Sequence, residues 1–335
     1  MIKIALYLPV LIAALAAIYF AAAFLLILSQ RPIDLSSIDS ISFEAVTGAP
    51  PESSPASPLK RMTTQAGTSI PFRHYPARSD TAPLAVIIHG SGWHGGSYLD
   101  IASALAEQGA VEVLVPDLRG HGVVPERRGD VDYIGQFEDD LAALINAHGE
   151  AARHVVMIGH SSGGGLTIRF AGGQHGSLLD RAVLIAPYLH HSAPTFRHSA
   201  GGWAHPLVRR IIGLSMLNGV GVTAFNGLTV IQFNYPDSIL NSSQGRTATQ
   251  AYSYRLNASF NPREDYRSDI ARLPEFLLIA GMDDDAFFAD QYAPVMQAIS
   301  PRGTYKLLPD AGHIGLLTDQ RALQVIVDFV QRPFL

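Results

Sequence analysis

Apolar and polar residues follow three different patterns along the 335-residue chain. Residues 4–28 form one apolar stretch without a charged side chain, residues 31–58 show no regular period, and from residue 59 onward short apolar runs alternate with longer amphipathic segments. These patterns are typical of a membrane-spanning helix, a linker, and a domain in which strands alternate with helices. We therefore expect an anchor over residues 1–30, a Pro/Ser-rich linker over 31–58 and one folded domain over 59–335.

The apolar stretch is long enough to cross a membrane. At about 1.5 Å per residue, a helix over residues 4–28 is about 37 Å long, against a bilayer core of about 30 Å. A cleaved signal peptide is the alternative, but residues 28–32 offer no convincing small-x-small cleavage site. Lys3 and the α-amine on one side barely outweigh Arg31 on the other, which favours a cytoplasmic N-terminus and an extracytoplasmic domain.

Six apolar runs in the folded part have the length and β-branched content of strands. They cover residues 84–89, 111–117, 154–160, 181–187, 275–281 and 304–310, with segments of helical length such as 132–148 and 162–172 between most of them. This alternation indicates an α/β fold with a mostly parallel sheet and helices on both faces. Residues 62–65 and 70–75 flank Ala66-Gly67-Thr68, which predicts a hairpin that adds an antiparallel edge.

One connection in this alternation is too long for a simple crossover. Residues 188–274 separate the runs at 181–187 and 275–281, and they contain many aromatic and small residues. Long insertions in compact domains are often lids or binding elements, although such a segment can also pack only on itself. We expect a helical cap over about residues 190–268.

Composition excludes several kinds of chemistry. The net charge of −5 with only 16% charged residues provides no basic surface, so we expect no nucleic-acid partner. The chain has no cysteine, which excludes disulfides, thiol nucleophiles and cysteine zinc sites. The 13 histidines include no H-E-x-x-H motif, and the adjacent His190 and His191 would point in different directions, so we expect no metal site.

The strongest chemical motif lies between the run at 154–160 and the helical segment at 162–172. Gly159-His160-Ser161-Ser162-Gly163 is a G-x-S-x-G sequence, in which a serine on a tight turn between strand and helix projects its hydroxyl from the end of the sheet. The N-terminus of the following helix lies near the negative charge that develops during attack. This context predicts that Ser161 is a nucleophile.

A serine nucleophile needs a base and an acid that orients the base, each at the end of a later strand. His313 follows the last apolar run and is the candidate base. Asp283, Asp284 and Asp285 follow the run at 275–281, and because consecutive side chains diverge, only one of them can reach the imidazole. The order Ser, Asp, His is that of the hydrolases with a nucleophile elbow.

A glycine-rich turn after the run at 84–89 allows a different interpretation. Gly90, Gly92 and Gly95 spell G-x-G-x-x-G, residues 98–108 can form the next helix, and Asp117 has the spacing of a ribose-binding acid. These features are typical of a dinucleotide-dependent oxidoreductase. That interpretation leaves Ser161, the aspartates and His313 unexplained.

Taken together, these motifs resemble the α/β-hydrolase family, specifically its monoacylglycerol lipase and lysophospholipase-like branch, from about residue 59 to the end. The branch has H-G, then x-G-x-H and a tyrosine after its third strand, matched here by His89, Gly90, Gly92, His94 and Tyr98. Residues 116–122 also resemble the family's next loop, whereas Trp93 and Ser97 replace charged residues that are common there.

The resemblance implies roles for particular residues. The family's acid falls three residues after a glycine, which from Gly281 selects Asp284. The backbone N–H groups of Ser91 and Ser162 would form the oxyanion hole, and a glycine-rich turn allows two such donors to converge. His89 and His94 would brace this loop, and Asp117 would shape its own loop near Arg119.

We therefore expect a membrane-anchored serine hydrolase that cleaves acyl esters without cofactor or metal, using Ser161, His313 and Asp284. The apolar cap and the anchor favour a small-molecule or lipid ester such as a monoacylglycerol or lysophospholipid. Aminopeptidases and thioesterases share this scaffold and stay open as alternatives, as do an inactive binding module and, more distantly, the oxidoreductase.

Overall fold

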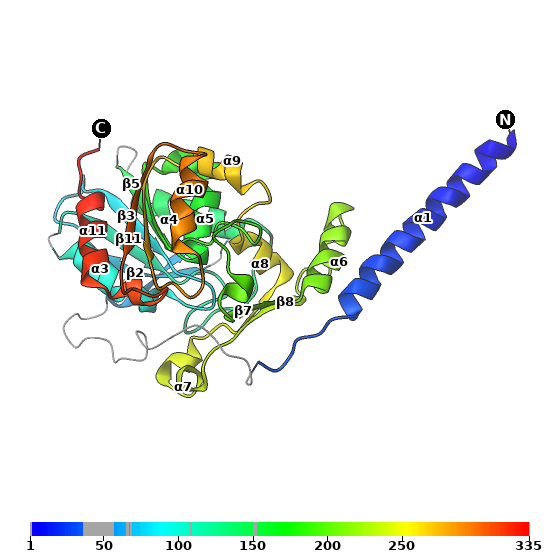
Figure 1. Ribbon diagram of the computed structural model, residues 1–335, viewed down its shortest axis with the longest axis horizontal. Coiled ribbons are helices and arrows are strands. Elements are labelled where there is room, and N and C mark those ends of the chain that lie inside the picture. Colours follow the sequence, from blue (N-terminus) through cyan, green and yellow to red (C-terminus); the bar gives the residue numbers. More distant parts are fainter. Residues whose placement is uncertain are drawn as a thin grey trace.

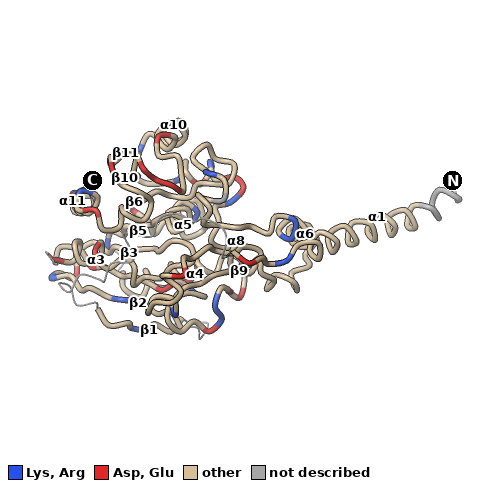
Figure 2. Tube along the Cα trace, turned by 60° about the horizontal axis from the view of Figure 1, so that its bottom comes forward, with Lys and Arg blue, Asp and Glu red and all other residues tan. Residues whose placement is uncertain are grey.

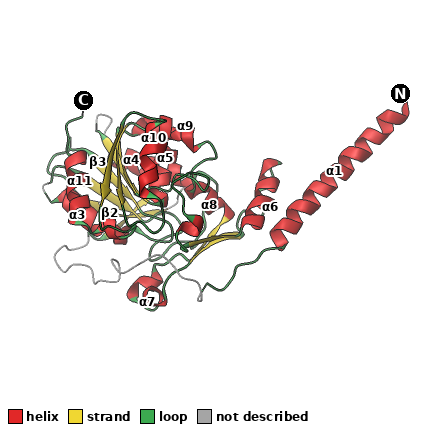
Figure 3. Cartoon of the chain, viewed as in Figure 1, coloured by secondary structure: helices red, strands yellow, loops and turns green. Residues whose placement is uncertain are grey.

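The computed structural model describes residues 2–35, 57–64, 67, 69–107, 109–149 and 153–334, with side chains from Leu8 onward except those of Ser199 and Ser243. Its centre is an eight-stranded sheet in the order β1-β2-β4-β3-β5-β6-β10-β11 (Figure 1, Figure 3). The strands are β1 (Leu59–Thr63), β2 (Ser69–Tyr75), β3 (Leu84–Ile88), β4 (Glu112–Pro116), β5 (Val155–His160), β6 (Arg181–Ile185), β10 (Glu275–Gly281) and β11 (Gly303–Leu308).

The pairing of these strands confirms the expected α/β class. Neighbouring strands from β4 to β11 are parallel, while β1 pairs antiparallel with β2 and β2 pairs antiparallel with β4. The predicted hairpin is thus β1–β2 at the edge, although Ala66 and Thr68 of its turn lie outside the described residues. Because the carboxyl ends of parallel strands share one edge, the loops after β3, β5, β10 and β11 meet there.

Helices cover both faces of the sheet and bury two separate cores. Alternate residues of β3 belong to different cores, with Leu84, Val86 and Ile88 on one side and Ala85 and Ile87 on the other. The first core includes residues of α4 (Gln136–His148), α5 (Ser162–Gly172), α9 (Tyr266–Ala271) and α10 (Tyr292–Gln297), and the second includes residues of α3 (Leu99–Ala106) and α11 (Gln320–Val330). Both faces of β3 are therefore fully desolvated.

The long insertion forms a cap, which contains strands as well as helices. Its elements are β7 (Ala204–Pro206), α6 (Val208–Gly219), β8 (Thr229–Phe233), α7 (Asp237–Leu240), β9 (Ala251–Ser253) and α8 (Tyr254–Phe260). The expectation of a helical cap needs correction, because β7, β8 and β9 form an antiparallel sheet. β8 has the residues that favour strands, but its partners have only three residues each, too few to show a period of two.

Short 3-10 turns complete the described secondary structure. They are η1 (Gly95–Tyr98), η2 (Gly176–Leu178), η3 (His198–Ala200), η4 (Ser243–Arg246), η5 (Ala289–Gln291) and η6 (Gly315–Leu317).

The N-terminal apolar stretch is one long helix, α1 (Ile2–Leu28), that projects away from the domain (Figure 1). Residues Leu8–Leu28 have the length and composition of a membrane span, and only 11% of the most apolar window is buried in the protein. Residues 4–28 of this helix contain no charged side chain, and the part of the helix that Figure 2 draws in tan shows none. Most of the predicted linker, residues 36–56, lies outside the described residues.

Candidate active site

Ser161 occupies a sharp turn between β5 and α5. Its backbone has φ 54° and ψ −120°, a combination that L-residues adopt only under strain and that is found mainly at functional sites. The glycines on either side allow this turn to form. A Cβ on Gly159 would lie 2.2 Å from the Gly163 carbonyl oxygen, and a Cβ on Gly163 would lie 2.4 Å from that of Ile88.

Asp284 and His313 contact one another in the loops after β10 and β11. His313 Nδ1 lies 2.9 Å from Asp284 Oδ2, and both side chains are buried. The other carboxylate oxygen, Oδ1, accepts the backbone N–H groups of Ala286 and Phe287 at 2.8 and 2.7 Å. The backbone therefore fixes the carboxylate in the orientation that meets the imidazole.

The two flanking aspartates take other positions. Asp283 is exposed, and Asp285 is half-buried. Burial opposes protonation of His313, but the charge of Asp284, its hydrogen bond and the charge of Asp285 outweigh burial, so the pKa of His313 is raised above 6.5. Of the three candidates, Asp284 is the one that binds His313.

His160 connects the Ser161 turn to the His313 loop. Its Nε2 lies 3.2 Å from the His313 carbonyl oxygen, and the centroids of the two imidazole rings are 4.7 Å apart. Among the described residues, the Ser161 hydroxyl makes no hydrogen bond to His313. Catalytic hydrogen bonds are often long in the absence of substrate and shorten when substrate binds.

The two residues expected to supply oxyanion-hole amides lie beside each other. Ser91 Oγ and Ser162 Oγ are 3.0 Å apart, and a Cβ on Gly90 would lie 3.3 Å from Ser161 Cβ. Ser162 begins α5, where backbone N–H groups have no partner within the helix. Within the described part of the chain, the amides of Ser91 and Ser162 donate to no protein acceptor.

A buried chain of polar groups supports the Ser91 loop from below. The Gly90 N–H donates to Tyr98 Oη at 2.8 Å, which leaves the Tyr98 hydroxyl free to donate to His160 Nδ1 at 2.9 Å. His160 Nε2 then donates to the His313 carbonyl. Burial, with a smaller contribution from His313, holds the pKa of His160 well below 6.5, in keeping with a neutral ring. The sequence offered no signal for this connection.

The cap supports the same loop from above. Tyr252 of β9 accepts the Gly92 N–H at 2.5 Å, and its hydroxyl also lies 2.7 Å from His121 Nε2. Gly92 has φ 81°, and a Cβ there would lie 2.4 Å from the hydroxyl oxygen of Tyr235 and 3.0 Å from Trp203. Only glycine fits between these aromatic rings of the cap.

His89 and His94 brace the loop through hydrogen bonds, as predicted. His89 Nε2 accepts the Leu118 N–H at 3.1 Å, and burial lowers the pKa of His89 to about 4. His94 Nδ1 accepts the Gly96 N–H at 3.1 Å.

Asp117 also shapes the loop, as expected, and its ion-pair partner is Arg73, not the nearby Arg119. Its Oδ1 accepts the Gly95 N–H at 2.9 Å and pairs with Arg73 at 3.0 Å, whereas Arg119 pairs with Asp140. Arg73 lies on β2, which pairs with β4 just before Asp117, a neighbour that local sequence does not reveal.

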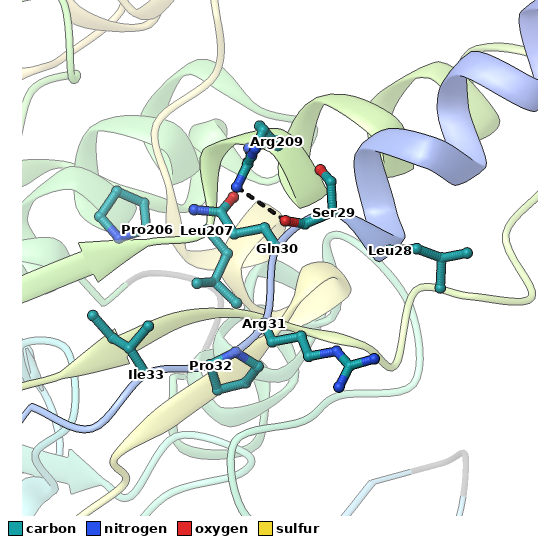
Figure 4. A pocket seen from close by; sticks show the side chains of 9 residues that line it. All are labelled: Leu28, Ser29, Gln30, Arg31, Pro32, Ile33, Pro206, Leu207 and Arg209. Atoms are coloured by element: carbon teal, nitrogen blue, oxygen red, sulfur yellow. Dashed lines mark hydrogen bonds between the residues drawn. The ribbon is translucent and has the colours of Figure 1, made fainter.

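In the described ranges, no group of three or more His, Asp or Glu side chains is arranged to hold a metal ion. A pocket of about 510 Å³ lies between the end of α1 and the cap, and Figure 4 shows its lining residues. None of them is a candidate catalytic residue.

Comparisons with solved structures show the same fold. The structure of a soluble variant of monoglyceride lipase from Saccharomyces cerevisiae matches with a TM-score of 0.63 and 15% identity, covering 83% of this chain and 95% of that one. The monoacylglycerol lipase of Paleococcus ferrophilus matches with a TM-score of 0.56 and 18% identity, covering 78% and 98%. At such identities the likeness concerns the fold alone.

Sequence comparisons cover a smaller region. Protein phosphatase methylesterase 1 of Bos taurus is 27% identical over 101 residues, which are 30% of this chain and 26% of that protein. The probable protein phosphatase methylesterase 1 of Caenorhabditis elegans is 30% identical over 134 residues, which are 40% of this chain and 36% of that protein. The model of the alpha/beta hydrolase family matches residues 85–329, which is most of the chain. On this match the chain belongs to the alpha/beta hydrolase family.

Proposed function

We propose that this protein is a membrane-anchored serine hydrolase of carboxylic esters. The observation that carries the proposal is the buried His313–Asp284 pair, held at one edge of the sheet beside a serine in a strained turn. A buried carboxylate that orients an imidazole is the arrangement that activates a serine hydroxyl.

The proposed reaction begins when Ser161 Oγ attacks the ester carbonyl carbon and His313 Nε2 takes the hydroxyl proton. The N–H groups of Ser91 and Ser162 bind the oxyanion of the tetrahedral intermediate. The intermediate collapses to an acyl-serine, and the imidazolium gives its proton to the departing alcohol. Water then attacks the acyl group while His313 takes a proton from it, and collapse releases the acid and restores Ser161.

The substrate class follows from the cap. Trp203, Phe233, Tyr235 and Tyr252 pack against one another above the Gly92 loop, which supports an apolar acyl chain as the group bound there. We propose a lipid-like ester such as a monoacylglycerol or lysophospholipid. A panel of acyl esters, acyl thioesters and aminoacyl anilides separates this proposal from thioesterase and aminopeptidase activity.

The catalytic assignment is tested with Ser161→Ala. We expect this variant to lose labelling by a fluorophosphonate probe and hydrolysis of p-nitrophenyl esters, because no nucleophile is left to form the acyl-enzyme. Ser300→Ala, a buried serine after α10, serves as the control and should keep both. Undiminished labelling of the Ser161→Ala protein would contradict the proposal.

We also propose that residues 1–30 are a retained anchor, residues 31–58 a linker and residues 59–335 the catalytic domain, with its cap at about 190–268. Ala23 and Ile27 of α1 pack with Leu214 and Leu217 of α6 in a small buried core. Cleavage of α1 would expose this core, at about 1.5 to 3 kcal/mol for each large apolar side chain. Immunoblotting of alkali-washed membranes should find the uncleaved chain in the membrane fraction.

A further inference from the structure

Cap helix α6 lies against the last third of the membrane-spanning helix α1, and the two run in opposite directions (Figure 1). Tyr19 Oη donates to the Met216 carbonyl at 2.7 Å. Further along, a Cβ on Gly213 would lie 2.6 Å from the Ala23 carbonyl oxygen, so the two backbones approach closely. α6 therefore follows α1 toward the N-terminal end of the membrane span.

This pairing fixes the depth of α6. Tyr19 precedes Leu28, the end of the span, by nine residues, which is about 13 Å of helix. Half the hydrocarbon core of a bilayer is about 15 Å. If Leu28 lies at the boundary of the core, Met216 lies close to the middle of the bilayer, and α6 cannot remain in water.

The surface of this part of the cap has the composition that such a position requires. Residues 211–236 contain no charged side chain and no histidine. Ile212 is 47% exposed and Val220 is 52% exposed, although both are large and apolar. Phe225 is also exposed and lies edge-on against Phe24 of α1, with ring centroids 5.4 Å apart, so the apolar surface continues from one helix to the other.

Several polar side chains of the same segment have partners within the protein. Asn218 and Asn226 exchange two amide hydrogen bonds, at 2.7 and 2.8 Å, and Ser215 Oγ lies 2.9 Å from Tyr254 Oη. In hydrocarbon, polar groups must find partners within the protein, because no water is available. This pairing removes the penalty that an unpartnered amide would bring.

The charged residues of α6 are confined to its start, at the end of the span. Arg209 donates to the Ser29 carbonyl at 2.9 Å, and Arg210 donates to the Gln30 carbonyl at 2.6 Å. Both arginines thus lie beside the end of α1, where hydrocarbon gives way to headgroups. Figure 4 shows Arg209 and Arg31 at this place. Arginine is typical of this level of a bilayer.

We propose that α6 and the loop at residues 220–228 are inserted into the same bilayer leaflet as the end of α1, with Ile212, Val220 and Phe225 in contact with lipid acyl chains. The cap then attaches the catalytic domain to the membrane independently of the linker. This inference rests on the proposal that α1 spans the membrane.

The absence of cysteine from the chain allows a direct test with the full-length protein. Ile212→Cys and Val220→Cys are labelled one at a time with a nitrobenzoxadiazole fluorophore and reconstituted in phosphatidylcholine vesicles. Leu15→Cys reports on α1, and Leu307→Cys serves as the control. Leu307 is an apolar residue, 40% exposed, on β11, far from α6 in Figure 1.

We expect labels at 212 and 220 to show blue-shifted emission and to be quenched by lipids that carry a spin label on the acyl chain, as the label at 15 is. The label at 307 should show neither effect. If the labels at positions 212 and 220 behave like the label at 307 while the label at 15 is quenched, the inference is wrong, but α1 still spans the membrane. If 15 is not quenched either, the proposed anchor has failed. A blue shift that depends on protein concentration, without lipid quenching, would show that a second copy of the chain covers this face and would overturn the inference.

Discussion

Replacing Asp284 by asparagine keeps the size of the side chain and reverses one hydrogen bond. In the native protein, Oδ1 accepts the N–H groups of Ala286 and Phe287, and Oδ2 accepts from His313. The amide oxygen of Asp284→Asn must take the Oδ1 position, because the opposite orientation leaves two buried N–H groups unpaired at about 1 to 3 kcal/mol each. The NH₂ group then faces His313 and donates to it.

That orientation leaves His313 in the wrong tautomer. With Nδ1 accepting from the amide, the ring proton resides on Nε2, which cannot then take the proton of Ser161 Oγ. A carboxylate-to-amide change of this kind lowers kcat by about 10⁴-fold in serine hydrolysis, equivalent to about 5.4 kcal/mol of activation free energy. Because the amide is locked by two backbone donors, we expect the full effect.

The assay is p-nitrophenyl ester hydrolysis as a function of pH, with Asp283→Asn and Asp285→Asn as neighbouring controls. For the native protein, kcat/KM should rise with pH through a midpoint above 6.5, since the base acts deprotonated and its pKa is raised. In Asp284→Asn the main raising charge is gone while burial remains, so the pH midpoint of the residual activity should be lower. A loss below tenfold in a folded Asp284→Asn protein, or an equal loss in Asp283→Asn, would refute the reasoning.

Three further predictions concern the supports of the site. Ser91→Ala should keep most esterase activity and Ser91→Pro should lose about 10² to 10³-fold in kcat, since the proposed role belongs to the N–H group; equal losses would contradict it. Tyr98→Phe leaves two buried hydrogen-bond partners unpaired, whereas Tyr292→Phe leaves only one. In thermal unfolding, the free energy of unfolding should fall by about 2 to 6 kcal/mol in the first variant and by about 1 to 3 kcal/mol in the second. Gly163→Ala forces a methyl group against a backbone oxygen and should destabilise the folded protein by about 1 to 3 kcal/mol. Gly315→Ala should leave the unfolding midpoint unchanged, because a Cβ at this position would have no neighbouring atom within 4 Å.

The local sequence pattern was sufficient to predict the sheet and to place the candidate catalytic residues in the loops at its edge. The run at 154–160 is apolar on both faces because β5 lies inside a parallel sheet, and parallel strands bring the loops that follow them to one edge. The contact between Asp284 and His313 follows from this topology. The choice of Asp284 over its two neighbours did not follow from local pattern alone, and it agrees with the family resemblance.

Contacts between distant parts of the chain could not be predicted in the same way. Tyr252 and Gly92 are 160 residues apart, and nothing in either neighbourhood indicates the other. The pairing of α1 with α6 depends on the close approach at Gly213, and the sequence around this glycine gives no sign of a partner helix. The cap sheet was missed because its outer strands are too short to produce a period.

The hydrogen bond from the Gly92 N–H to Tyr252 has a consequence for exchanging caps between related enzymes. Tyr252 comes from the cap, yet it fixes the backbone next to Ser91, so the cap is a structural part of the proposed catalytic centre. A chimera that carries another protein's cap would need a hydroxyl group at the place of Tyr252 to retain the geometry of that loop. We therefore expect a cap graft that changes substrate range to change turnover as well.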